Sequence, residues 1–200
     1  REAIVAVSIL QQDNWILAES CGGDIPYKPP FFAWCIAALS VVFGGEVTEF
    51  LSRLPSALAL IAMTLVGYRF YARRSTPKVA MLMAIISITA FEVFRAGYAC
   101  RVDMVLTAFI VTALYALYRH HEKGAKGISI LAILLMSGGM LTKGPVAILL
   151  PCLVIGVYRL LRGDGFWRAF LNLTLHAVLS LVIPAMWYVA AYLQSGDEFL

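Results

Sequence analysis

The chain has 200 residues, of which 61% are hydrophobic and 14% are charged, and its mean hydropathy is +0.82. Soluble domains carry about 45–50% apolar and about 25% charged residues, so this composition excludes a soluble domain and predicts an all-α membrane protein. The net charge is +4, but the basic residues stand in small groups at the ends of apolar stretches, where lipid headgroups are their natural partners. Nucleic acid is therefore not expected as a partner.

The first 52 residues are predicted to form an outer loop with two helices along the membrane surface. Residues 2–12 place apolar side chains at helical spacing but are too few to cross a bilayer. Residues 15–30 are rich in glycine and proline and are predicted to be a loop. The apolar residues 31–43 would give about 20 Å of helix against a hydrocarbon core of about 30 Å. We therefore expect a helix that does not cross.

Residues 53–200 are predicted to form one transmembrane region. Its six expected spans cover residues 53–72, 79–97, 104–118, 128–142, 145–161 and 171–193. Pro151 and Pro184 lie inside spans, which is tolerated where neighbouring helices satisfy the freed carbonyl groups. A tight Thr-Lys-Gly-Pro turn joins the fourth and fifth spans.

Charged residues are divided unequally between the two sides of these spans. Ten of the 16 Lys and Arg residues, but only two of the 12 acids, lie in residues 69–78, 119–126 and 159–168. Loops rich in Lys and Arg stay on the cytoplasmic side of a membrane. The other connections are therefore predicted on the non-cytoplasmic face, where we expect the functional residues.

A rigid turn at residues 24–30 presents the first candidate binding residue. Two prolines follow Lys28 and start the next helix, so the ammonium group is held by a fixed backbone near the headgroups. It can hold a phosphate as a point charge. It can equally be a lysine that extends its charge to the membrane interface. The residue pattern leaves both interpretations open.

A second candidate lies where one predicted span ends and the next begins. Asp103 is two residues from Arg101 and stands at the mouth of a span. An arginine beside a carboxylate favours the anion that a base or hydrogen-bond acceptor needs. The same two residues could instead form an ion pair that fastens two spans together. Lys143, at the outer end of a hairpin of spans, could attract an anionic lipid or bind headgroups.

Metal-site spacing is absent from the sequence. His120 and His121 lie in a basic loop and His176 lies within a span, where histidines are more often solvated or packed than metal ligands. No metal ligand is therefore predicted. Among functions, a lipid-phosphate transporter or flippase component is an alternative to an enzyme. Transporters often need polar groups deep within their spans, whereas the charges here lie at span ends.

Six short motifs together resemble one family of membrane enzymes. They are Arg-Glu-Ala at residues 1–3, Tyr-Lys-Pro-Pro at 27–30, Arg-Leu-Pro-Ser-Ala at 53–57, Arg-Val-Asp at 101–103, Thr-Lys-Gly-Pro at 142–145 and Ile-Pro-Ala-Met-Trp-Tyr at 183–188. Over all 200 residues the chain resembles the GT-C-type glycosyltransferases that use polyprenyl-phosphate sugars. Within them it is most similar to the aminoarabinose transferase and dolichyl-phosphate-mannose-protein mannosyltransferase group.

The resemblance implies a GT-C-type bundle that transfers a sugar from a polyprenyl-phosphate donor to a glycolipid or protein acceptor, with inversion. It implies a multi-pass protein of a bacterial inner membrane whose active face is periplasmic. By the same resemblance Asp103 is catalytic, and Lys28 holds the carrier phosphate. The predicted substrate-binding residues are then Arg1, Tyr27, Lys28, Arg101 and Lys143.

Two departures from the family pattern limit what the resemblance implies. The family's first catalytic acid stands just before the arginine that matches Arg1. We therefore expect that acid, the later spans and the C-terminal domain outside this chain, and we expect the chain alone to be inactive. Aminoarabinose transferases often have an acid implicated in metal binding where this chain has Tyr27. The resemblance thus leaves a divalent metal open and does not identify the sugar.

Overall fold

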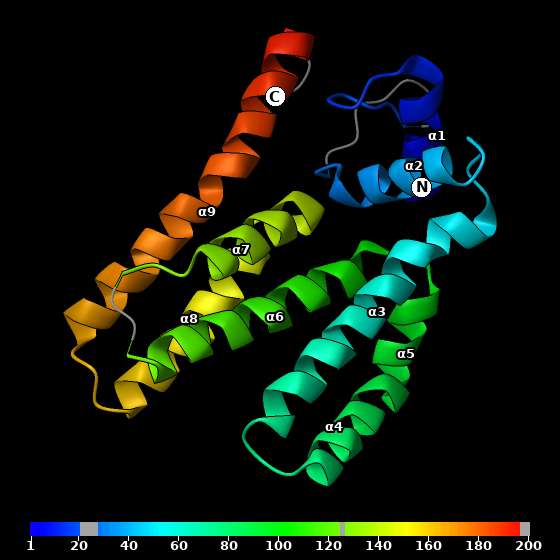
Figure 1. The fold of residues 1–200 in the computed structure, drawn as a ribbon. Helices are drawn as coiled ribbons and strands as arrows, with labels where there is room; N and C mark the ends of the chain where they lie inside the picture. The colour runs from blue at the N-terminus through cyan, green and yellow to red at the C-terminus, as the bar shows by residue number, and fades with distance from the viewer. Residues whose placement is uncertain (21–27, 125–126, 197–200) are drawn as a thin grey trace.

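The computed structural model describes residues 1–20, 28–124 and 127–196. These residues form nine α-helices and no β-strand (Figure 1). The helices are α1 Glu2–Gln12, α2 Phe31–Val42, α3 Glu49–Ala72, α4 Pro77–Thr89, α5 Phe91–Tyr98, α6 Val102–Glu122, α7 Ile130–Lys143, α8 Val146–Leu161 and α9 Phe166–Ser195. The helix predicted over residues 2–12 is present as α1, and the apolar residues 31–43 form α2.

Several helices begin where a hydroxyl side chain caps the first turn. Thr48 Oγ1 accepts a hydrogen bond of 3.2 Å from the backbone N–H of Leu51 at the start of α3. Thr76 caps α4 in the same way and is followed by Pro77, whose missing N–H costs nothing in a first turn. Ser129 caps α7. Local sequence therefore sets these starting points.

Three helices of the described chain are long and apolar enough to cross a membrane. They are α3, α6 and α9, with 24, 21 and 30 residues. Large apolar side chains on their outer faces, such as Leu58, Ile61 and Leu65 of α3, remain exposed. Exposed apolar side chains on helices that satisfy their own backbone hydrogen bonds are what a bilayer requires. The all-α membrane fold predicted from composition is confirmed.

The predicted span at residues 79–97 is broken in the structure. Helices α4 and α5 meet at Ala90 with a bend of 66°, and together they could form a fourth crossing. Ser87 and Thr89 donate hydrogen bonds of 2.8 and 2.7 Å back to the carbonyl groups of Met83 and Ile85. Such bonds compete with the helix ladder and bend it. The hydropathy pattern carries no signal of this bend.

Helices α7 and α8 form a short hairpin around Gly144. They have 14 and 16 residues, fewer than the roughly 20 that a straight crossing needs, and correspond to the short spans predicted over residues 128–142 and 145–161. Gly144 has a φ of +100°, which explains the glycine in the Thr-Lys-Gly-Pro turn. A Cβ atom at Gly139 would lie 2.7 Å from that of Ala147, so glycine allows the two helices to approach closely.

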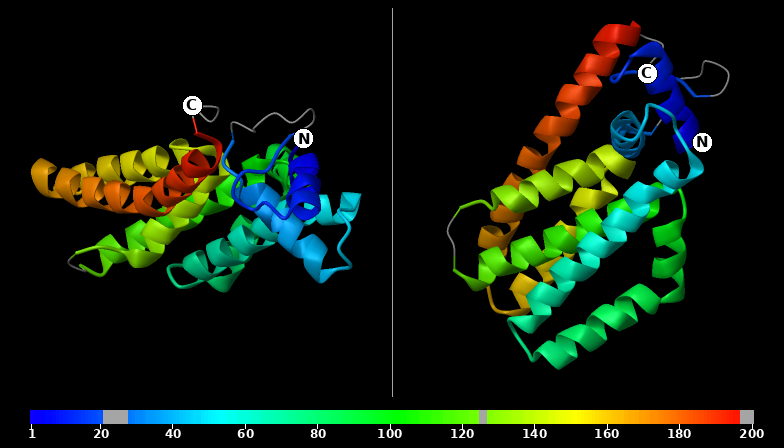
Figure 2. Two further views of the ribbon diagram at one scale, coloured as in Figure 1. Left: turned by 90° about the horizontal axis from the view of Figure 1, so that it is seen from above. Right: turned by 45° about the vertical axis from the view of Figure 1, so that its right-hand side comes forward.

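The three basic loops lie together at one end of the bundle (Figures 1 and 2). Arg74, after α3, forms an ion pair with Glu122 at the end of α6. Asp164, after α8, accepts a hydrogen bond of 2.7 Å from Arg159, which lowers the pKa of its carboxyl group. His121 lies 3.7 Å from the same carboxylate. Glu122 thus joins the loop after α3 to the end of α6, and Asp164 lies between Arg159 in the last turn of α8 and His121 in the last turn of α6.

The short helices α1 and α2 lie at the opposite end of the bundle (Figure 1). They bury Ile9, Phe32 and Ile36 in a shared core that also receives Val102 and Val105 from the start of α6. Trp187 of α9 donates a hydrogen bond of 3.1 Å to the carbonyl of Ile16, so the end of α9 is tied to the loop after α1. We call this end, with α1, α2, the α5–α6 junction and the α7–α8 turn, the candidate-site end.

Candidate functional site

Asp103 and Lys143 form an ion pair at the candidate-site end. Lys143 Nζ lies 2.5 Å from Asp103 Oδ1, and about 45% of each side chain is exposed (44% and 45%). Asp103 is in the first turn of α6 and Lys143 is the last residue of α7. An acid near a helix N-terminus and a base near a C-terminus are each favoured by the helix dipole. The pair joins α6 to the α7–α8 turn.

This pairing differs from both sequence interpretations of Asp103, which assumed Arg101 as its partner. Arg101 is instead the N-cap residue of α6, and its carbonyl accepts a hydrogen bond of 3.1 Å from Ser56 Oγ of α3. Arg101 and Asp103 line one cavity of about 460 Å³ between α5 and the start of α6. Lys143 is therefore the ion-pair partner of the candidate catalytic acid, a contact that the sequence interpretation of Lys143 as a lipid-binding residue did not include.

Lys28 and Arg1 lie next to each other although 27 positions separate them. Together with Glu2 and Pro30 they line a small depression between the start of α1 and the start of α2. Lys28 Nζ donates to Glu2 Oε1 at 3.3 Å, and 36% of the lysine side chain is exposed against 13% of the glutamate side chain. The lysine is thus half-buried and paired with an acid. Sequence reasoning did not identify Glu2 as its partner.

A second cavity beside this depression adds another arginine to the site. It has a volume of about 430 Å³ and is lined by Arg1, Arg53 and the hydroxyl-bearing residues Thr48 and Ser52. Arg53 forms an ion pair with Glu49 one turn earlier on α3. The cavity, which Glu49 also lines, therefore contains two guanidinium groups, one carboxylate and two hydroxyl groups, polar groups that can hydrogen-bond a sugar.

The predicted site residue Tyr27 lies outside the described residues. Within residues 1–20, 28–124 and 127–196, no three His, Cys, Asp or Glu side chains are grouped to hold a metal ion. Glu2 and Asp103 each have a lysine partner.

Comparison with known proteins places these features in a family. Residues 27–188 match the family model described as dolichyl-phosphate-mannose-protein mannosyltransferase. That match covers more than half of the chain and includes four of the predicted site residues in the described segments, Lys28, Arg101, Asp103 and Lys143. The chain belongs to this family.

Individual members of the family are similar at low identity but over nearly the whole chain. An undecaprenyl phosphate-alpha-4-amino-4-deoxy-L-arabinose arabinosyl transferase of Pseudomonas aeruginosa is 28% identical over 98% of this chain and 36% of its own length. An uncharacterised protein of Aquifex aeolicus is 28% identical over 86% of this chain and 34% of its own length. The chain thus spans about a third of the curated relatives it matches.

Solved structures confirm the GT-C-type fold. The crystal structure of ArnT from Cupriavidus metallidurans bound to undecaprenyl phosphate superposes with a TM-score of 0.84 at 26% identity. The apo structure of the same protein gives a TM-score of 0.85 at 25% identity. In each case the match covers 99% of this chain and 37% of the solved one. The predicted family resemblance and fold class are confirmed.

Proposed function

We propose that the whole protein containing this chain is a glycosyltransferase. It takes a sugar from a polyprenyl-phosphate donor and passes it, with inversion, to a glycolipid or protein acceptor on the non-cytoplasmic face of a bacterial inner membrane. Family membership supports the reaction class, and the relatives' names support an undecaprenyl-phosphate donor. Because the chain spans about a third of those relatives, the activity is assigned to the whole protein and not to these 200 residues alone.

The observation that carries the proposal is the shared depression of Arg1 and Lys28. Two cations, Arg1 just before α1 and Lys28 just before α2, converge at the end of the bundle opposite the basic loops, beside helices too short to cross the membrane. In sugar transfer the bond between the sugar and the carrier oxygen breaks, and the carrier phosphate leaves with the electron pair. Preorganised cations beside that oxygen stabilise the charge that develops there.

The pairing of Lys28 with Glu2 suggests how the lysine is kept in place without substrate. Glu2 satisfies the ammonium group, and a phosphate that carries more negative charge can replace the carboxylate as its main partner. Asp103 would orient a donor or acceptor hydroxyl, with Lys143 neutralising part of its charge. Arg101 lines the same cavity and would contact the bound sugar or phosphate.

One experiment separates the transferase from a transporter of the same lipid. The whole protein is reconstituted in vesicles with a polyprenyl-phosphate sugar labelled in the sugar and with a glycolipid acceptor. A transferase moves the label onto the acceptor and releases polyprenyl phosphate in equal amount. Movement of intact donor across the bilayer without release of polyprenyl phosphate would contradict the proposal.

The proposed membrane face predicts a pattern of cysteine labelling. In a variant of the whole protein without native cysteines, Ser75→Cys and Lys123→Cys should be shielded from an impermeant thiol reagent in intact cells, whereas Glu46→Cys should react. All three residues are exposed and have negative φ, unlike the neighbouring Gly45 and Gly124. The basic loops are held inside because Lys and Arg resist translocation. Labelling at Ser75→Cys but not at Glu46→Cys would reverse the assigned face.

A further inference from the structure

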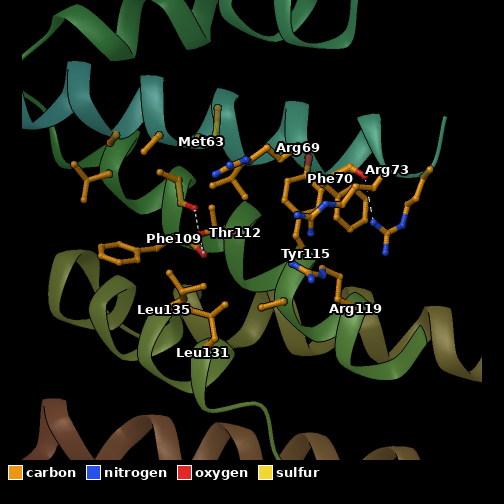
Figure 3. A pocket seen from close by; sticks show the side chains of 17 residues that line it. Met63, Arg69, Phe70, Arg73, Phe109, Thr112, Tyr115, Arg119, Leu131 and Leu135 are labelled. Carbon is orange, nitrogen blue, oxygen red and sulfur yellow. Dashed lines mark hydrogen bonds between the residues drawn. The ribbon is translucent and has the colours of Figure 1, made fainter. Parts of the chain in front are cut away.

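A groove at the basic end of the bundle has no role in the proposed transfer reaction. It has a volume of about 630 Å³ and lies between α3, α6 and α7 (Figure 3). Four arginines line it, Arg69, Arg73, Arg74 and Arg119. The candidate-site end, which includes Lys28 before α2 and Asp103 in the first turn of α6, is at the opposite end of the bundle.

The α3 wall of the groove changes from apolar to basic along its length. Ala62 and Val66 line its inner part, and Arg69 and Arg73 line the part nearest the helix end. From Ala62 to Arg73 the helix rises by about 16 Å. That length accommodates a headgroup and the first half of an acyl chain.

The α6 wall shows the same order. Phe109 and Thr112 come first, and Tyr115 and Arg119 follow toward the basic end. Both helices run from the candidate-site end to the basic end (Figure 1), so the arginines near their C-terminal ends lie at the same end of the bundle. Leu131 and Leu135 of α7 close the apolar side. The groove therefore has an apolar part and a positively charged part, which match the two ends of an anionic amphiphilic molecule.

The basic part of the groove has more arginine side chains than acidic side chains that could pair with them. Arg74 is paired with Glu122 and packs over the Phe70 ring at 3.8 Å. In the described part of the chain, Arg69, Arg73 and Arg119 have no acidic side chain within ion-pair distance. The stacked rings of Phe70 and Tyr115, whose centroids are 4.3 Å apart, lie among these arginines in the groove (Figure 3).

We propose that this groove binds an anionic glycerophospholipid. Its phosphate contacts Arg69, Arg73 and Arg119, since a guanidinium group donates two parallel hydrogen bonds to phosphate oxygens. An acyl chain lies against Val66, Leu131 and the other apolar residues of the walls. Phosphatidylglycerol or cardiolipin fits better than a zwitterionic lipid, whose own ammonium group would meet the three arginines. Basic pockets between helices at this level of a bilayer suit such headgroups.

Lipid binding to the purified whole protein tests the proposal. Phosphatidylglycerol should bind at least about tenfold more tightly than phosphatidylcholine, as measured by native mass spectrometry or by lipid-dependent Tm. The double variant Arg69→Gln with Arg119→Gln should abolish this preference. The matched double variant Lys78→Gln with Arg162→Gln removes the same charge from exposed positions outside the groove and should retain it. Leu131→Trp, which fills the apolar part and keeps every arginine, should also weaken binding.

Cross-linking identifies which ligand occupies the groove. A photoactivatable phosphatidylglycerol should attach within residues 59–74 and 105–119. If adducts form only outside these residues, another segment of the whole protein fills the groove and the proposal is refuted. The proposal is also refuted if the preference for phosphatidylglycerol is lost equally in the groove double variant and in the control double variant. Protection by inorganic phosphate alone at the same concentration, or by polyprenyl phosphate in preference to phosphatidylglycerol, would overturn the assignment of a glycerophospholipid.

Discussion

Replacing Asp103 with Asn should lower sugar transfer by the whole protein at least about hundredfold while leaving it folded. A positioned acid or base typically contributes about 10²–10⁴-fold to a rate. The side chains of Asp103 and Lys143 are both almost half exposed, and an ion pair so exposed stabilises a protein by about 0–1 kcal/mol. Loss of the pair alone should therefore leave detergent-extracted protein monodisperse. Transfer rate and size-exclusion profile are measured together.

A charge exchange distinguishes the functional role from a structural one. The double variant Asp103→Lys with Lys143→Asp restores an ion pair between α6 and α7 but moves the carboxylate. If Asp103 acts on substrate, this variant folds and remains inactive. If the ion pair only fastens the two helices, the double variant recovers activity that Asp103→Asn lost. Aggregation of Asp103→Asn on extraction would also favour the fastening role.

Replacing Lys28 with Ala should reduce transfer by at least about tenfold, with the larger part of the effect in KM for the polyprenyl-phosphate donor. A charge-assisted hydrogen bond is worth about 1.5–3 kcal/mol, and its loss removes a contact to the carrier phosphate. Lys28→Arg keeps the charge and should retain part of the activity. Initial rates are measured over a range of donor concentrations.

The matched control for Lys28 is Lys78→Ala, which removes an exposed lysine in the first turn of α4 at the other end of the bundle. It should leave KM for the donor unchanged. Unchanged kinetics of Lys28→Ala would show that this lysine marks the membrane interface only. An equal effect of both variants would mean that net charge, and not the position of Lys28, controls donor binding.

Much of the fold could be predicted because it depends on local signals. Apolar stretches of helical length located the helices from α3 to α9, and capping residues such as Thr48 and Ser129 mark their starts. Helix α2 has 12 residues, fewer than the roughly 20 that a straight crossing needs, and the length of its apolar stretch predicted this. The bend between α4 and α5 could not be predicted, because the hydroxyl groups of Ser87 and Thr89 compete with a helix that hydropathy alone makes continuous.

The sequence selected individual candidate site residues but did not predict their contacts. Lys28, Arg101, Asp103 and Lys143 were all selected from sequence motifs, and the structure places them at one end of the bundle. The partner of Asp103 was not predicted, because Arg101 is its neighbour in sequence and Lys143 is 40 positions away. The partner of Lys28, Glu2, is 26 positions away.

By itself the sequence determined that this protein is a helical membrane protein with its basic loops on one side, because hydropathy and charge act over single helices and single loops. Only the tertiary structure decided which charges meet and where a cavity remains. Helix packing sets both, through residues such as Gly138 and Gly139, whose missing side chains admit the Phe109 ring and bring α6, α7 and α8 together. The groove lined by Arg69 and Arg119 exists only because separate helices end at one level.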